Sequence, residues 1–139
     1  MLELKRINDH VSVAPQISPD DMPAIKAAGF TTVINNRPDG ESPDQPASAT
    51  MKAAAESAGL AYHHIPLGRD GVSPQMVEET EAVLEGSDGP VLAFCRSGTR
   101  STTLWALSQA EKLPAQDIVA QAAHAGYDMS HLLGHLSQK

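Results

Sequence analysis

Short apolar segments alternate with amphipathic segments along most of the chain. Three runs rich in strand formers, at residues 30–35, 60–67 and 91–94, predict strands, and the first of these is expected to be buried. The segments between and after them place apolar residues at helical spacing. Helices are expected over residues 18–29, about 48–58, 73–85, 102–113 and 115–125, with a short last helix after Asp128. This alternation predicts an α/β fold with a central, mostly parallel sheet flanked by helices.

The ends of several predicted elements carry clear local signals. Residues 4–14 alternate between polar and apolar positions and predict a hairpin that turns at Asn8-Asp9. Ser18-Pro19 and Ser73-Pro74 each combine a helix-capping hydroxyl with a proline suited to the first helical position. At 139 residues, without a linker or a repeat, the chain is expected to form one domain over residues 1–139.

Composition narrows the function classes. The net charge of −7 and the pI near 5.2 argue against nucleic acid or an anionic membrane as the main partner. The single cysteine excludes an intramolecular disulfide and a cysteine-cluster metal site. No apolar run approaches the ~20 residues of a membrane span, and the first residues do not form a signal peptide. We therefore expect a cytoplasmic protein.

The strongest chemical signal is the segment from Cys95 to Arg100, which we call the Cys95 loop. Its cysteine directly follows a predicted strand, and its other residues are too polar to surround a core thiol. A strand, a polar loop and a helix N-terminus form an anion-binding site, because loop N–H groups and the helix dipole favour negative charge. A thiol placed there ionises readily and becomes nucleophilic. The loop predicts a cysteine nucleophile that acts on a small anionic group, the alternative being a small core residue.

The neighbours of Cys95 suggest how such an anion would be bound. The planar fork of Arg100 can bind two oxygens at once. Arg96 either does the same or faces solvent, and Ser101 either donates a hydrogen bond to the thiolate or caps the helix. The remaining loop residues, Ser97, Gly98 and Thr99, would contribute backbone amides to the anion site.

Two further polar loops, at residues 36–41 and 68–71, also follow predicted strands. Ligands in open α/β sheets bind beyond the carboxyl ends of the strands, so all three loops are expected at one active site. Asp70 is a candidate general acid or a turn residue, and Asp39 has the same two interpretations. Arg37 and Arg69 are further candidate anion ligands in these loops.

The six histidines do not form a metal motif. His63 and His64 point to opposite faces of a predicted strand. His131 and His135 have the i, i+4 spacing of one side of a metal site, but no nearby acid or third histidine completes it. No metal and no organic cofactor are expected.

The Cys95 loop with Ser101, taken together with residues 30–41, resembles a known family. This is the bacterial phosphatase-like domain that also occurs fused to beta-lactamase-like hydrolases of the persulfide dioxygenase type. The resemblance spans nearly the whole chain, including the turn at residues 125–128. It implies a dual-specificity phosphatase fold. Its members are catalogued both as phosphatases and as sulfurtransferases.

Two departures from the phosphatase signature favour sulfur transfer. That signature has a histidine before the cysteine and five residues between cysteine and arginine, whereas this chain has Phe94 and only four residues between Cys95 and Arg100. The catalytic loop of rhodaneses is similarly shorter. A shorter ring of amides suits a persulfide sulfur better than a tetrahedral phosphate.

The main hypothesis is therefore a sulfurtransferase that forms a Cys95 persulfide from thiosulfate or a small persulfide. Because the chain has no second cysteine, the acceptor must be an external thiol such as glutathione. The resemblance further implies a persulfide dioxygenase as a functional partner. One alternative is phosphomonoester hydrolysis through a phosphocysteine, with Asp70 as the acid. Another, from a different class, is a non-catalytic anion-binding or redox-sensing domain.

Overall fold

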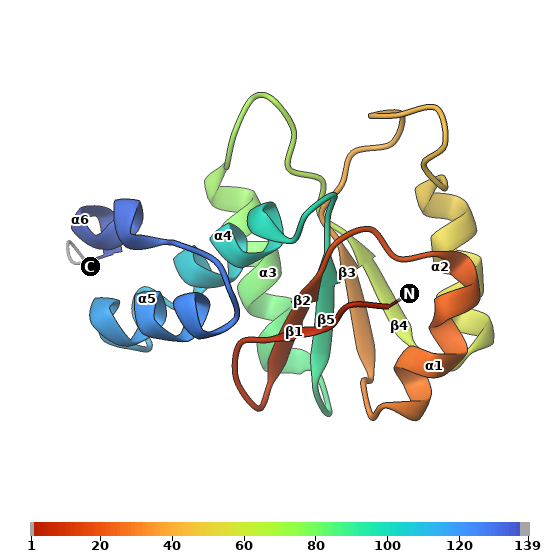
Figure 1. Cartoon of the computed structure of the whole chain (residues 1–139), viewed down its shortest axis with the longest axis horizontal. Coiled ribbons are helices and arrows are strands. Elements are labelled where there is room, and N and C mark those ends of the chain that lie inside the picture. Colours follow the sequence, from red (N-terminus) through yellow and green to blue (C-terminus); the bar gives the residue numbers. More distant parts are fainter. Residues whose placement is uncertain (1, 137–139) are drawn as a thin grey trace.

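The computed structural model describes residues 2–136, except for the side chain of His135. Its centre is a five-stranded sheet with the order β1-β2-β5-β3-β4 (Figure 1). The strands are β1 (Lys5–Arg6), β2 (Val11–Ala14), β3 (Thr32–Asn35), β4 (Ala61–His64) and β5 (Val91–Phe94). Only β1 and β2 pair antiparallel, as the predicted hairpin; the other pairs are parallel. The predicted α/β fold with a mostly parallel sheet is confirmed.

Helices cover both faces of the sheet (Figure 1). On one face lie η1 (Pro19–Asp21), α1 (Met22–Ala27) and α2 (Ser48–Ser57). On the other lie α3 (Pro74–Gly86) and α4 (Thr99–Ser108), with α5 (Ala115–His124) packed against α4. The chain continues into η2 (Ser130–Leu132) and α6 (Leu133–Leu136). Among the described residues, no helix is long and apolar enough to cross a membrane.

The central strand β5 is buried on both faces, which explains its unbroken apolar sequence. Successive side chains of a strand point to opposite faces. Val91 and Ala93 accordingly pack with Leu104 and Ile118, on the side of α3 and α4. Leu92 and Phe94 pack on the opposite side, in a cluster that also includes Met22, Ile25, Met51 and Ala55 of α1 and α2. The strand is thus fixed from both sides, and it ends directly at Cys95.

The helix after the Cys95 loop begins earlier than the sequence predicts. We expected it to start at Thr102 and to end at Leu113, but α4 runs from Thr99 to Ser108. The reason is Gly98, which adopts a left-handed conformation with φ 94° and acts as the N-cap. Its carbonyl accepts hydrogen bonds from both the backbone N–H and the side-chain hydroxyl of Thr102. Arg100 and Ser101 therefore lie in the first turn of the helix.

The packing of Phe94 gives a testable prediction. Its side chain is fully buried between the sheet and the helices α1 and α2. Phe94→Ala should lower the free energy of unfolding by about 3–5 kcal/mol, because it removes buried apolar surface and leaves a cavity. Urea denaturation measures the change. Leu4→Ala, at an exposed apolar side chain, is the control and should have little effect; equal losses in both variants would contradict this account of the core.

Candidate active site

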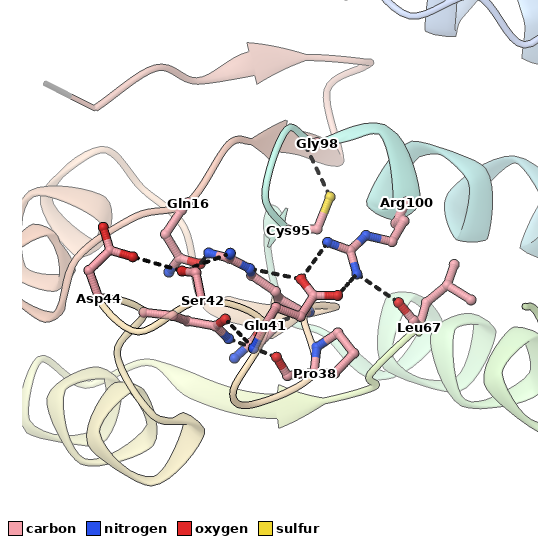
Figure 2. Close-up of polar contacts among 12 residues, drawn as sticks. Gln16, Pro38, Glu41, Ser42, Asp44, Leu67, Cys95, Gly98 and Arg100 are labelled. Atoms are coloured by element: carbon pink, nitrogen blue, oxygen red, sulfur yellow. Dashed lines mark hydrogen bonds and ion pairs between the residues drawn. The ribbon is translucent and has the colours of Figure 1, made fainter. Parts of the chain in front are cut away.

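The loops that the sequence predicts to share one site do meet at the carboxyl ends of the strands (Figure 2). Arg100, in the first turn of α4, connects them. Its Nη1 donates hydrogen bonds to Glu41, in the loop after β3, and to the carbonyl of Leu67, in the segment after β4. Cys95 lies beside this arginine at the end of β5 (Figure 2).

Cys95 is fully buried and carries a free thiol. The backbone N–H of Gly98 donates a hydrogen bond to its sulfur, with an N–Sγ distance of 3.0 Å. Hydrogen bonding to Glu41, and to a smaller extent the charge of the neighbouring Cys95 thiolate, raise the pKa of Arg100 above its usual value, against the opposing effect of partial burial. An amide donor and a guanidinium cation thus both stand beside the sulfur, as stabilisation of a thiolate requires.

Glu41, which faces Arg100 in Figure 2, also binds a second arginine, Arg37. Its Oε2 accepts from Nη1 of Arg100 at 2.7 Å, and its Oε1 accepts from Nη2 at 2.9 Å. Oε1 also accepts from Nε of Arg37 at 2.9 Å. The hydrogen bonds from Arg100 and then Arg37 outweigh partial burial and lower the pKa of Glu41 to about 2. The carboxylate therefore remains charged at any physiological pH.

Arg37, a candidate anion ligand from the sequence, has a different place. It is only 5% exposed, and its Nη1 and Nη2 donate to Gln16 Oε1 at 3.0 Å and to Ser42 Oγ at 3.3 Å. Together with the bond to Glu41, each of its three side-chain nitrogens has a protein acceptor. A buried guanidinium needs such partners, because an unpaired charge away from water is costly. Arg37 is thus held in place by Gln16 and Ser42, and it positions Glu41 through their ion pair.

The donors that Arg100 keeps free are those an anion would use. Both hydrogens of its Nη1 are engaged by Glu41 and Leu67, and one hydrogen of Nη2 is engaged by Glu41. Within residues 2–136, its Nε–H has no protein acceptor. Nε and Nη2 form one edge of the guanidinium plane, suited to two oxygens or to an oxygen and a sulfur of a bound anion. Glu41 therefore orients Arg100 without occupying this edge.

The other residues of the Cys95 loop differ in exposure. Arg96, Ser97 and Thr99 are exposed, and the hydroxyls of Ser97 and Thr99 lie 3.1 Å apart. Ser101 is buried, and in the described part of the chain its Oγ has no hydrogen-bond partner. The expectation that Ser101 caps the helix is wrong, because the helix begins before it, at Thr99. Its hydroxyl stays available for the other expected role, donation to the sulfur or to a bound group.

The candidate acids Asp39 and Asp70 differ in what their side chains contact. Asp39 has a structural contact: its Oδ1 accepts from the backbone N–H of Ser48 at 2.7 Å and so satisfies a free amide at the start of α2. Asp70 is exposed in a turn closed by a hydrogen bond from Gly71 N to Gly68 O. Arg69, in the same turn, is exposed as well. Within the described residues, neither of these two side chains makes a hydrogen bond or an ion pair.

No metal centre is formed by the part of the chain that the structure describes: no group of three or more histidine, cysteine, aspartate or glutamate side chains is arranged to hold an ion. His63 and His64 lie on the edge strand β4, and Nε2 of His64 is 2.9 Å from the carbonyl oxygen of Arg37. The relation between His131 and His135, which have i, i+4 spacing, lies outside the described residues, because the side chain of His135 is not among them.

Known proteins similar to this chain show which family it belongs to. Residues 3–112 match the family described as the phosphatase-like domain of beta-lactamase hydrolase-like protein. The chain belongs to this family. A beta-lactamase hydrolase-like protein of Agrobacterium fabrum is 35% identical over 126 residues, which cover 89% of this chain and 29% of the relative. The chain spans only about a third of the length of the curated relatives it matches.

Solved structures confirm the expected phosphatase-like fold. A crystal structure from Neisseria meningitidis, described as a "putative phosphatase", is 32% identical with a TM-score of 0.81, covering 96% of this chain and 95% of that one. The PTP-2 phosphatase of Cydia pomonella is 18% identical with a TM-score of 0.74, covering 100% and 91%. At that identity the second likeness shows the fold alone. The family description and the description of the Neisseria meningitidis structure are those of phosphatase-like proteins, and no comparison tests sulfur transfer.

The charge on Glu41 gives a pH-dependent prediction. Its folded pKa of about 2 lies below the usual 4.5, so its stabilising effect is complete above pH 4.5 and is lost as the pH falls towards 2. Glu41→Gln should cost about 1 kcal/mol of unfolding free energy at neutral pH, allowing for solvent screening. The difference from the unmodified protein should shrink between pH 4.5 and 2. Urea denaturation at a series of pH values measures it.

Glu56→Gln is the matched control, because Glu56 is an exposed carboxylate on α2 and makes no ion pair among the described residues. It should have little effect at any pH in the series. A cost of Glu41→Gln that stays constant from neutral pH down to pH 2 would overturn the assigned pKa.

Proposed function

We propose that this domain is a sulfurtransferase in which Cys95 carries the transferred sulfur. The observation behind the proposal is the short Cys95 loop: four residues separate Cys95 from Arg100, and the helix already begins at Thr99. Few loop amides can therefore surround a bound group, and one of them, the N–H of Gly98, points at Sγ from 3.0 Å. A site of this size favours a single sulfur atom on Cys95 over a phosphoryl group.

The reaction has two steps, each of which exchanges one S–S bond for another. The Cys95 thiolate bonds to the outer sulfur of thiosulfate, whose own S–S bond breaks to release sulfite; a small persulfide donor would release a thiolate instead. An external thiolate such as that of glutathione then bonds to the outer sulfur of the Cys95 persulfide. Cys95 leaves as a thiolate and is restored. No second cysteine exists in the chain to act as the internal acceptor.

The charged groups have distinct roles in this scheme. The free edge of Arg100 binds the anionic donor and stabilises the negative persulfide. Exposed Arg96 attracts the donor to a protein whose net charge is −7. Glu41 and Arg37 hold Arg100 in place.

The longer curated relatives carry further sequence beyond this domain, and we propose a persulfide dioxygenase as the functional partner of the domain.

Phosphomonoester hydrolysis is the second candidate, favoured by the family and by the description of the Neisseria meningitidis structure. Cys95 would attack phosphorus and form a phosphocysteine, with Arg100 on the phosphoryl oxygens. Release of an alkoxide leaving group then calls for a proton donor, and Asp70 is the candidate acid on the loops around Cys95. Its exposed position in a turn gives it no fixed orientation towards the thiol.

Intact-protein mass spectrometry separates the two candidates. After incubation with thiosulfate or glutathione persulfide, the protein should gain the mass of one sulfur atom and lose it again on addition of glutathione. Cys95→Ser should show no gain. The same preparation should hydrolyse phosphate monoesters slowly or not at all. Rapid ester hydrolysis without a sulfur adduct would refute sulfur transfer and support the phosphatase.

Substitution of Asp70 provides an independent kinetic prediction. Asp70→Asn should leave the rate of sulfur transfer nearly unchanged, because neither sulfite nor a thiolate needs protonation to leave. If the enzyme is instead a phosphatase, the same change should slow ester hydrolysis about 100-fold or more. Asp88→Asn, at an exposed residue beyond the opposite end of β5, is the matched control. A large loss of sulfur transfer in Asp70→Asn alone would contradict the proposed mechanism.

A further inference from the structure

Tyr127 contacts the Cys95 loop from outside, although it lies far along the chain. It follows α5, and its backbone N–H donates to the carbonyl of Ala122 at 2.9 Å, which ties the tyrosine to the end of that helix. Its side chain is half-buried, and its hydroxyl donates to the carbonyl oxygen of Ser97 at 2.9 Å. The contact joins two segments separated by 30 residues.

The carbonyl that Tyr127 binds belongs to the same peptide unit as the amide that faces the candidate nucleophile. The C=O of Ser97 and the N–H of Gly98 are the two ends of one planar group, and in a trans peptide they point in opposite directions. The carbonyl end is held by Tyr127, and the amide end donates to Cys95 Sγ at 3.0 Å. Fixing one end therefore fixes the direction of the other. A hydrogen bond to the carbonyl also polarises the amide and strengthens it as a donor.

The side chain of Tyr127 also packs closely against the backbone of Gly98. Gly98 has a φ of 94°, which side chains other than glycine rarely adopt. A Cβ at this position would lie 2.1 Å from the hydroxyl oxygen of Tyr127 and 2.8 Å from its Cζ. The tyrosine thus occupies the space directly over Gly98. The glycine allows both the left-handed turn and the close approach of the ring.

The hydroxyl of Tyr127 also stays protonated under working conditions. Burial first, and then the negative charge of a Cys95 thiolate, raise the pKa of Tyr127 above its usual value near 10. The groups that face the thiol are Arg100 from α4 and the Gly98 amide, with Glu41 behind Arg100. None of them competes with Tyr127 for the Ser97 carbonyl.

We propose that Tyr127 is a positioning residue, whose hydroxyl holds the Ser97–Gly98 peptide with its N–H directed at the sulfur of Cys95. This inference rests on the proposed role of Cys95 as the nucleophile. The turn after α5 would thus contribute, through Tyr127, to the reactivity of the Cys95 thiol at the end of β5. The phenol acts through the peptide: its hydrogen bond goes to the Ser97 carbonyl, and the Gly98 N–H is the group that meets the sulfur.

The test is the pH dependence of the rate at which iodoacetamide alkylates Cys95, measured in Tyr127→Phe. This variant keeps the ring over Gly98 and removes only the donor. Without the hydrogen bond, the midpoint of the profile should move to higher pH, and alkylation at neutral pH should slow by roughly threefold to tenfold, the range expected for one hydrogen bond. The plateau rate at high pH, where the thiol is ionised in either protein, should change little.

Tyr62→Phe is the matched control. Tyr62 is the other tyrosine of the chain, and its hydroxyl is also hydrogen-bonded, to Asn35 and Ser48, on the face of the sheet that α2 covers. It should lower stability without moving the alkylation profile. An unchanged profile in Tyr127→Phe would overturn the proposal, as would an equal shift in both variants. Because alkylation requires no turnover, the result stands apart from the outcome of the sulfur-transfer assay.

Discussion

The site depends on one carboxylate, Glu41, placed between two guanidinium groups. Arg37 is buried and needs partners for its charge, so its ion pair with Glu41 stabilises the fold as well as the site. The same carboxylate extends the pairing to Arg100 and so connects the loop after β3 to the first turn of α4. Two arginines against one carboxylate leave one positive charge beside Cys95. The two arginines, Glu41 and an ionised Cys95 therefore carry no net charge together.

This charge balance gives Arg96 its importance. Once the thiolate has formed, Arg37, Arg100, Glu41 and Cys95 are together neutral, so an incoming anionic donor gains no net attraction from them. Arg96 directly follows Cys95 in the sequence. Its side chain is exposed and makes no ion pair within the described residues. In an acidic protein such an exposed cation next to Cys95 can attract an anion, as can the exposed Arg69. Arg100, by contrast, supplies orientation through its remaining edge.

Much of this arrangement follows from sequence patterns, and the exceptions have physical causes. The apolar runs and the paired Ser-Pro signals predict the strands, the helix starts and the meeting of three loops, because these depend on local propensity and on parallel-sheet geometry. The start of α4 was missed because a left-handed glycine as N-cap looks like an ordinary loop residue in sequence. Glu41 was missed as a site residue because its partner Arg100 is 59 residues away. Its spacing of four from Arg37 is a signal that is usually interpreted only within helices.

Tyr127 shows the limit of such inference most clearly. Its hydroxyl binds a backbone carbonyl, and backbone acceptors are present at every residue, so no residue type in the Cys95 loop indicates the contact. What the sequence does contain is Gly98, whose missing side chain makes room for the ring. The early start of α4 and the ring over Gly98 act together on the loop: one shortens it, and the other fixes its peptide. A loop held at its middle and closed by a helix after three residues has little freedom to expand. In the sulfurtransferase that we propose, such a loop would enclose one small atom, a sulfur attached to Cys95, and not a tetrahedral group.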